Sequence, residues 1–300
     1  AAAPRELAER PELCARVLEA LRSPAPPDRE AVLEWILEDV PYLSMHPGGC
    51  RFVQELLTVA GAAGRDQLAE ILGPYTVELL ESPHGNYVLT KIIEVMPAAS
   101  LTPIIEAIQR YGYRAVARHR FGCRVLERLI EHCTERELEM SALNDQLVEI
   151  AEELCRHQYG NFVVKGLLEH ARHLGDAIVQ RLLPTLPTLA THRTASHVVQ
   201  CALTYASYDC VREIVSALFD AGGPYSLLEV AASRYGSYVI EEILSIRGPG
   251  SREFVAEAGR RLAGASAEHW ESDHFVRVAQ RYGLLPPGAA ANAAEVAAAP

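Results

Sequence analysis

Apolar residues recur along this chain with the period of an α-helix. From Cys123 to His132, a wheel that advances about 100° per residue gathers the aliphatic side chains on one half. Those residues are Val125, Leu126, Leu129 and Ile130. The pattern predicts a helix that buries one side and leaves the other side open.

The same pattern returns six times. The matching segments are HPGGCRFVQELL from His46, SPHGNYVLTKII from Ser82, HRFGCRVLERLI from His119, HQYGNFVVKGLL from His157, HRTASHVVQCAL from His192 and SRYGSYVIEEIL from Ser233. Their small turn residues, Gly49, Gly85, Gly122, Gly160, Ala195 and Gly236, follow one another at intervals of 36, 37, 38, 35 and 41 residues. Near-constant spacing over six matches identifies an internal repeat.

Each repeat is predicted to contain two helices. A helical stretch such as Leu101–Arg118 comes first, a short turn that ends in the small residue follows, and a second helix such as Cys123–His132 comes last. The starts or turns of the first helices carry prolines, where a missing N–H costs least, namely Pro74, Pro103, Pro184 and Pro224. We expect an all-α fold, a right-handed α-solenoid whose second helices line the concave side, with almost no strand.

The ends of the chain differ from its middle. We divide it into an N-terminal flank or decayed repeat (1–27), six repeats (28–248), a degenerate capping repeat (249–285) and an Ala/Pro/Gly-rich tail (286–300) predicted to be disordered. Residues 5–22 are predicted to form a helix, followed by the break Pro24-Ala25-Pro26-Pro27. The cap's second helix is predicted within SDHFVRVAQRY.

Composition narrows the class of protein. Of the 300 residues, 49% are hydrophobic, enough for a sizeable core, and no apolar run is long enough to cross a membrane. Seven cysteines without a C-x-x-C pair favour a reducing compartment, and we expect a cytoplasmic location. The chain begins with Ala1, without a secretory signal, which we interpret as a mature fragment or an excised domain. A net charge of −11 argues against a protein held on nucleic acid mainly by phosphate neutralisation.

The open half of each second helix presents three side chains, at the first, second and fifth positions after the turn residue. These triads are Cys50, Arg51, Gln54; Asn86, Tyr87, Thr90; Cys123, Arg124, Glu127; Asn161, Phe162, Lys165; Ser196, His197, Gln200; and Ser237, Tyr238, Glu241. The middle member is always flat, and the outer two suit hydrogen bonds to a base edge. Flat exposed side chains are typical of surfaces that stack unpaired bases. The alternative is an ordinary polar face of a scaffold.

These segments resemble the repeats of the Pumilio family, which read about one RNA base per repeat. The resemblance covers about residues 28–285. In order, the six segments resemble the third to the eighth of the usual eight repeats, and SDHFVRVAQRY resembles the C-terminal flanking pseudo-repeat. By that alignment the first two repeats are missing or have decayed into residues 1–27. The resemblance implies sequence-specific binding of single-stranded RNA, of the mRNA 3′ UTR type, by a post-transcriptional regulator of translation or stability.

The resemblance also implies which base each repeat reads. A small residue with Gln reads adenine, which assigns adenine to Cys50/Gln54 and Ser196/Gln200. A small residue with Glu reads guanine, which assigns guanine to Cys123/Glu127 and Ser237/Glu241. Asn86/Thr90 and Asn161/Lys165 keep the Asn of the uracil pair and lose its Gln. Because the family's RNA runs antiparallel to the protein, the expected element is 5′-G-A-(U)-G-(U)-A-3′, in which the bracketed bases depart from the code.

Other chemistry finds little support in the sequence. His46, His119, His157 and His192 share one slot but lie on separate repeats, too far apart to share one metal ion, so we assign them to the turns. Cys50 and Cys123 stand where Ser196 and Ser237 also occur, which indicates steric fit rather than nucleophilic catalysis. Motifs of phosphate loops, zinc proteases and serine hydrolases are missing from the sequence. We therefore expect no enzymatic activity, no cofactor and no metal.

Two functions remain open at this point. The first is RNA binding by a monomer, with repression or decay proteins on the convex face and no membrane partner. The second is a protein-binding α-solenoid of the armadillo or HEAT type that has lost RNA specificity. The net charge and the two departures from the uracil pair favour the second, whereas six flat residues and four intact pairs favour the first.

Overall fold

The computed structural model of this protein describes residues 3–22, 29–133, 137–248 and 250–286. Within these ranges the secondary structure is helical and contains no strand. The chain divides into two compact units, residues 1–147 and residues 148–300. The proline-rich break Pro24-Ala25-Pro26-Pro27 and the predicted disordered tail after Pro286 lie outside the described residues.

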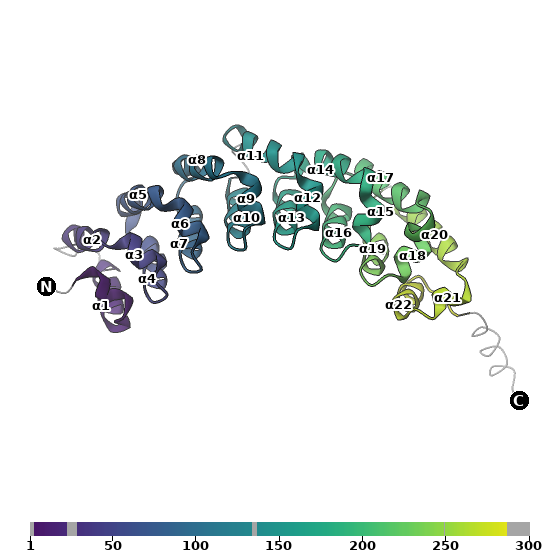
Figure 1. Ribbon diagram of the computed structural model, residues 1–300, viewed down its shortest axis with the longest axis horizontal. Helices are drawn as coiled ribbons and strands as arrows, with labels where there is room; N and C mark the ends of the chain where they lie inside the picture. The colour runs from purple at the N-terminus through teal and green to yellow at the C-terminus, as the bar shows by residue number, and fades with distance from the viewer. Residues whose placement is uncertain (1–2, 23–28, 134–136, 249, 287–300) are drawn as a thin grey trace, which may run out of the picture. The chain divides into compact units, whose positions relative to one another are not determined.

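The first unit begins with a flank and continues as repeated groups of helices (Figure 1). Its elements are η1 (Pro4–Ala8), α1 (Pro11–Arg22), α2 (Arg29–Leu37), α3 (Val40–Met45), α4 (Gly49–Val59), α5 (Gly61–Leu72), η2 (Gly73–Tyr75), α6 (Thr76–Glu81), α7 (Gly85–Val95), η3 (Ala98–Leu101), α8 (Thr102–Tyr111), α9 (Tyr113–Arg118) and α10 (Gly122–His132). Helix α11 (Glu137–Glu149) follows.

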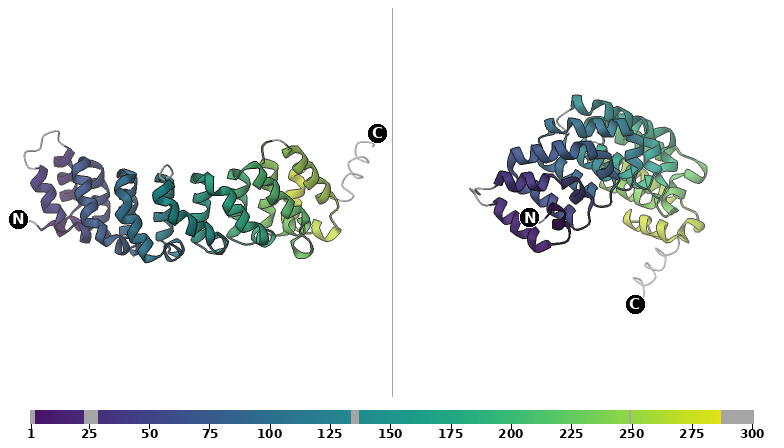
Figure 2. Two further views of the ribbon diagram at one scale, coloured as in Figure 1. Left: turned by 90° about the horizontal axis from the view of Figure 1, so that it is seen from above. Right: turned by 60° about the vertical axis from the view of Figure 1, so that its left-hand side comes forward.

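The second unit repeats the same grouping, as the further views of Figure 2 also show. Its elements are α12 (Ala151–Arg156), α13 (Gly160–His170), η4 (Arg172–Leu174), α14 (Gly175–Leu182), η5 (Leu183–Thr185), α15 (Leu186–Ala190), α16 (Ala195–Tyr205), α17 (Tyr208–Asp220), η6 (Gly223–Tyr225), α18 (Leu227–Ala232), α19 (Gly236–Glu242), η7 (Ile243–Ser245), α20 (Ser251–Ala263), α21 (Ala267–Trp270) and α22 (Asp273–Arg281).

Each repeat contains three helices, so the prediction of two helices per repeat is wrong. The predicted first helix Leu101–Arg118 is interrupted at Gly112, whose φ of +106° belongs to a region that favours glycine. Three of the four prolines noted in the sequence mark the same interruption in other repeats, because Pro74, Pro184 and Pro224 lie in 3-10 turns between the first and second helices. Pro103 instead stands at the start of α8. We number the repeats one to six from α2–α4 to α17–α19.

The third helices of successive repeats pack side by side and build the core of each unit. In the first unit α4 packs on α7 and α7 on α10; in the second, α13 packs on α16, α16 on α19 and α19 on α22. The aliphatic half of α10 is buried as the wheel predicts, and Leu129 is 0% exposed. A leucine buried in this way contributes about 1.5–3 kcal/mol. The α-solenoid class predicted from the repeat is confirmed, with three helices per repeat.

The flank and the cap carry the helices expected at the two ends of the repeats. Residues 5–22 form the short η1 and the longer α1, which packs on α4. The predicted second helix of the cap corresponds to α22, which packs on α18 and α19. In the described part of the chain, none of the helices has both the length and the apolar character of a membrane span.

Candidate nucleic-acid interface

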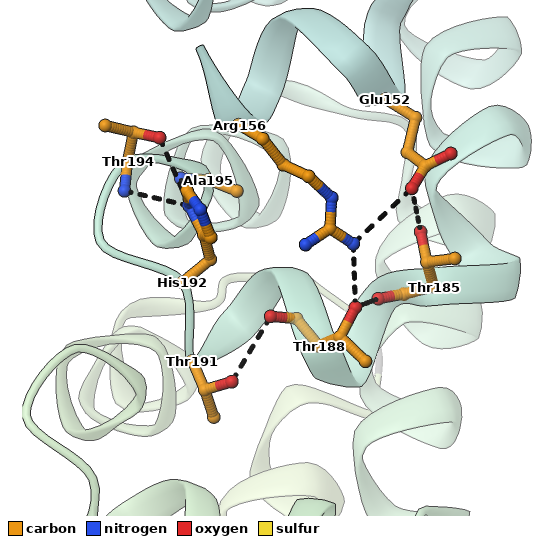
Figure 3. Close-up of polar contacts among 8 residues, drawn as sticks. All are labelled: Glu152, Arg156, Thr185, Thr188, Thr191, His192, Thr194 and Ala195. Atoms are coloured by element: carbon orange, nitrogen blue, oxygen red, sulfur yellow. Dashed lines mark hydrogen bonds and ion pairs between the residues drawn. The ribbon is translucent and has the colours of Figure 1, made fainter. Parts of the chain in front are cut away.

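The turn before each third helix is held by one side-chain acceptor. The Nδ1 atom of His119 accepts the backbone N–H of Gly122 over 3.2 Å, and His157 accepts that of Gly160 over 3.2 Å. In repeat five, His192 accepts the N–H groups of Thr194 and Ala195 over 3.2 and 3.3 Å (Figure 3). These bonds satisfy donors that a helix start leaves unpaired. The structure therefore confirms that these histidines stabilise turns.

Serine performs the same task where histidine is absent. The Oγ atoms of Ser82 and Ser233 accept the N–H groups of Gly85 and Gly236, each over 3.0 Å. At Gly122 a Cβ atom would lie 2.7 Å from the backbone oxygen of Val116, so this turn favours glycine, whereas repeat five accommodates the methyl group of Ala195. The turn thus starts every third helix in the same orientation and presents equivalent side chains from repeat to repeat.

The first member of each triad is buried at the start of its helix. Asn86 is 1% exposed, and its amide nitrogen donates to the backbone oxygen of Ser82 over 2.7 Å. Asn161 is 4% exposed and donates to His157 over 2.9 Å. The remaining first members, all small residues, are buried too, namely Cys50, Cys123, Ser196 and Ser237. Small side chains at this slot leave room beside the middle and third members.

Burial also decides the chemistry of the two cysteines in this slot. Burial, with the nearby carboxylate of Glu127, raises the pKa of the Cys123 thiol to about 11. Burial raises the pKa of Cys50 as well. A protonated thiol is a poor nucleophile. Both cysteines are free, and the steric role inferred from the sequence fits their environment better than catalysis does.

The middle members are exposed, although three of them are aromatic. Tyr87 is 48% exposed, Phe162 40% and Tyr238 46%. The other middle members, Arg51, Arg124 and His197, are exposed as well. A regular series of exposed apolar rings is typical of a surface that binds a ligand. In the first unit the guanidinium of Arg124 reaches the hydroxyl of Tyr87 over 3.5 Å, so the flat side chains of repeats two and three are neighbours.

The third members lie beside the flat ones at the edge of the same surface. Gln54 and Gln200 donate to the backbone oxygens of Cys50 and Ser196, four positions earlier, over 3.0 and 3.1 Å. These bonds use one amide hydrogen and leave the amide oxygen and the second hydrogen for a ligand. Thr90 makes the same backward bond to Asn86 over 2.8 Å.

Two of the remaining third members are placed differently. The ammonium of Lys165 lies 4.8 Å from the centre of the Phe162 ring. Glu127 is partly exposed on α10.

We call the exposed surface of these triads the reading face, formed by α4, α7 and α10 in the first unit and by α13, α16 and α19 in the second.

The sixth triad has partners that the sequence analysis missed. Glu241, with its side chain 10% exposed, pairs with Arg277 over 2.7 Å and with Arg281 over 2.8 Å, both from α22. Arg277 also donates to Ser237 over 2.8 Å. The spacing in the sequence could have revealed the contact between Arg277 and Glu241, because the two residues are 36 positions apart, which is close to the repeat length.

The first repeat opens into a groove between the flank and the reading face. Its volume is about 1130 Å³, and its walls come from α1 and α4 with a contribution from α7. The lining residues include Cys14, Leu18 and Glu19 from α1, Cys50, Arg51 and Gln54 from α4, and Tyr87 from α7. The first triad therefore lies in a recess large enough for a nucleobase.

Charge is divided unevenly between the turns with their third helices and the rest of the chain. The segments 46–59, 82–95, 119–132, 157–170, 192–205 and 233–242 hold eight Lys or Arg and seven Glu, a net charge of +1. Because the whole chain has a net charge of −11, the residues outside these segments have a net charge of −12. The acidic composition is thus concentrated outside the turns and third helices, which together are close to neutral.

The fold and this surface define a class of protein: a helical-repeat protein that presents one equivalent triad of side chains per repeat. Comparison with known proteins then identifies the family. The family model described as the Pumilio-family RNA-binding repeat matches residues 39–72, 76–109, 113–140, 151–173, 186–219 and 226–253. The chain belongs to this family, as its sequence predicts.

Relatives and solved structures agree with that assignment. The chain is 28% identical over 184 residues to Pumilio homology domain family member 4 of Saccharomyces cerevisiae, covering 60% of this chain and 20% of the relative. It is 22% identical over 245 residues to Fem-3 mRNA-binding factor 2 of Caenorhabditis elegans, covering 73% and 39%. The chain thus spans well under half the length of these relatives.

Among solved structures, PUF-8 in complex with PBE-RNA matches with a TM-score of 0.80 at 20% identity, over 89% of this chain and 78% of that one. The Puf4 RNA-binding domain bound to the HO endonuclease RNA 3′ UTR recognition sequence matches with a TM-score of 0.72 at 21% identity, over 94% and 93%. At these identities the matches show a shared fold.

Proposed function

We propose that this protein binds single-stranded RNA of the mRNA 3′ UTR type along its reading face, with one base at each triad. The observation that carries the proposal is the series of exposed flat side chains at one slot of successive third helices. A base that stacks between two such side chains covers their apolar faces, at about 1–3 kcal/mol per base. The relatives named for mRNA binding and the neighbours solved with RNA support the same function.

The third member of each triad would then select the base. Gln54 and Gln200 keep a mixed donor and acceptor edge, which matches adenine, whereas the carboxylate of Glu127 accepts the two adjacent donors of guanine. Asn86/Thr90 and Asn161/Lys165 are assigned weakly to uracil. The proposed target remains 5′-GAUGUA-3′, in which the third and fifth bases are the least defined.

Phosphate contacts should contribute less than in a basic protein, because several cations near the reading face are already paired. Lys91 lies 3.3 Å from Glu94, and Arg128 lies 2.7 Å from Glu131. A cation that already has a carboxylate partner displaces fewer counterions when a phosphate arrives. Arg51, Arg124 and Lys165 remain the best candidates for phosphate or base contacts.

The test is the affinity for 5′-GAUGUA-3′ and for a scrambled RNA of the same composition across a salt series. We expect specific binding, with a logarithmic salt slope of magnitude below about 2, since each phosphate contact adds about 0.7 for a single strand. Equal affinity for both RNAs, or a steep slope, contradicts base reading. If neither RNA binds at low salt, the face serves a protein partner instead.

The cellular role is proposed from the family. We propose a monomeric regulator of mRNA translation or stability in the cytoplasm, which recruits repression or decay proteins. All seven cysteines are free thiols, which suits a reducing compartment. Cross-linking in cells, followed by sequencing of the bound RNA, tests this role. Enrichment of 3′ UTR fragments that carry the element is the expected result.

A further inference from the structure

One residue of the C-terminal cap, Arg277, contacts all three members of the sixth triad. The guanidinium carbon of Arg277 lies 4.3 Å from the centre of the Tyr238 ring. Its Nε atom donates to Oε1 of Glu241 over 2.7 Å, and its Nη2 atom donates to Oγ of Ser237 over 2.8 Å. One planar group thus lies over the ring of the stacking residue, which stays 46% exposed, and bonds both edge residues of the same triad.

A guanidinium is a close chemical substitute for guanine in such a site. The N1–C2–N2 part of guanine presents two adjacent N–H donors in one plane, and a guanidinium presents donors in the same arrangement. Both groups are flat, and both stack on an aromatic ring. The guanidinium differs in its positive charge, which adds an ion pair to hydrogen bonds that the carboxylate makes charge-assisted in both cases.

The cap holds Arg277 in this position before any ligand arrives. Ser272 begins α22 by accepting the N–H of Phe275, and it donates to the backbone oxygen of Ala232 over 2.9 Å. At the other end of the helix, the hydroxyl of Tyr282 donates to the backbone oxygen of Ile240 over 2.9 Å. The helix is therefore bonded at both ends to α18 and α19.

A second arginine completes the neutralisation of Glu241. Arg281, one turn after Arg277, donates to Oε2 of Glu241 over 2.8 Å, so both carboxylate oxygens have a cationic partner. An incoming guanine would have to displace an ion pair that is intramolecular and already ordered. A neutral base that must also give up its own freedom of motion is a weaker competitor.

We propose that Arg277 occupies the base site of the sixth repeat as an internal substitute for guanine, so that the reading of RNA ends at the fifth repeat. The proposal rests on the proposed function and deepens it, since Arg277 becomes a specificity-determining residue. The sequence alone assigns guanine to Ser237/Glu241. With Arg277 in place, the read element shortens to the five bases 5′-AUGUA-3′.

The wild-type protein alone provides the first test. Fluorescence anisotropy is measured with 5′-GAUGUA-3′, with the three RNAs that carry another first base, and with 5′-AUGUA-3′. We expect all five affinities to agree within about twofold, because no bidentate base contact is made at the first position. A preference for G at the first base of about tenfold or more overturns the inference.

Removal of Arg277 should open the site. Arg277→Ala is expected to prefer G over A at the first base by about tenfold, because a carboxylate with four lone-pair positions can accept guanine while Arg281 stays bound. Arg281→Ala is the matched control: it removes the same charge from the same helix, leaves Arg277 on Tyr238, and should show no first-base preference. Thermal unfolding verifies that each variant is folded.

The fourth base separates this inference from the proposed function. All three proteins should lose affinity when the fourth base is changed from G to A, since Glu127 is unaltered. If that loss is seen and Arg277→Ala still ranks the first bases equally, the inference fails while RNA reading stands. If no protein distinguishes any base, the proposed function fails. Should Arg277→Ala not fold, the wild-type measurement still decides between a five-base and a six-base element.

Discussion

The third and sixth repeats carry the same kind of pair, a small residue followed four positions later by a glutamate. Cys123/Glu127 and Ser237/Glu241 differ in their surroundings. Glu127 is partly exposed on α10, whereas Glu241 lies between two arginines of α22 with its side chain 10% exposed. The same pair of residue types thus occurs in two different environments, and the following helix supplies the difference at Glu241.

Repeat four also has a cation as the third member of its triad, but this cation is placed differently from Arg277. Lys165 stands in the same slot of repeat four as Arg277 does in the cap, and its ammonium lies over Phe162 of its own helix. A compact ammonium on a flexible stem lacks the planar fork that lets Arg277 contact Ser237, Tyr238 and Glu241 together. In the proposed arrangement, this difference between Lys and Arg determines where the reading of RNA ends.

The largest expected effect is a change of base preference. Glu127→Gln should move the preference at the fourth base from G to A, with a swing of about 3 kcal/mol, because an amide matches the donor and acceptor of adenine. Gln54→Glu should do the reverse at the last base. Glu241→Gln should leave every preference unchanged, since no base is read at that site in the proposed arrangement. The measurement is affinity for four RNAs that differ at one base, at fixed salt, and equal rankings for wild type and Glu127→Gln contradict the assignment.

A smaller effect should separate the two exposed tyrosines. Tyr87→Ala should weaken binding of 5′-GAUGUA-3′ by about 2 kcal/mol, because a base loses its stacking partner. Tyr238→Ala should cost below about 0.5 kcal/mol, well short of a base-stacking contribution, because we propose that Arg277, rather than a base, stacks on its ring. Tyr87→Phe, which keeps the ring and removes the hydroxyl next to Arg124, is the control and should bind normally. Equal losses for the two alanine variants would place a base on Tyr238.

The smallest effect concerns the stability of the cap. Glu241→Ala should lower the melting temperature by about 2–4 °C, equivalent to about 1 kcal/mol, because the arginines of α22 lose their shared partner. Both arginines are partly exposed, so the loss should shrink as salt is added. Glu242→Ala removes the same charge at the next position, outside this pair, and serves as the control. A loss as large for Glu242→Ala would mean that net charge, rather than the ion pair, stabilises the cap.

Several features of the fold were predictable because they depend on spacing within one helix. The aliphatic half of α10 and the exposed Arg124 follow from about 100° of rotation per residue. The turn histidines follow from their recurrence three residues before the turn residue. The interruption at Gly112 was missed, since a helical pattern on both sides of a glycine does not reveal whether the helix continues through it.

The sequence by itself determined the repeat, the aliphatic face of its helices and the exposed middle member of each triad, because these are local, whereas the first members are buried. Only the tertiary structure decided which triads are open to a ligand. Arg277 and Glu241 lie 36 residues apart and meet at 2.7 Å because α22 packs on α19. Such a contact depends on how two helices pack and on the rotamers that the packing allows. The neighbouring helix in space, rather than the pair itself, therefore decides which groups surround the triad.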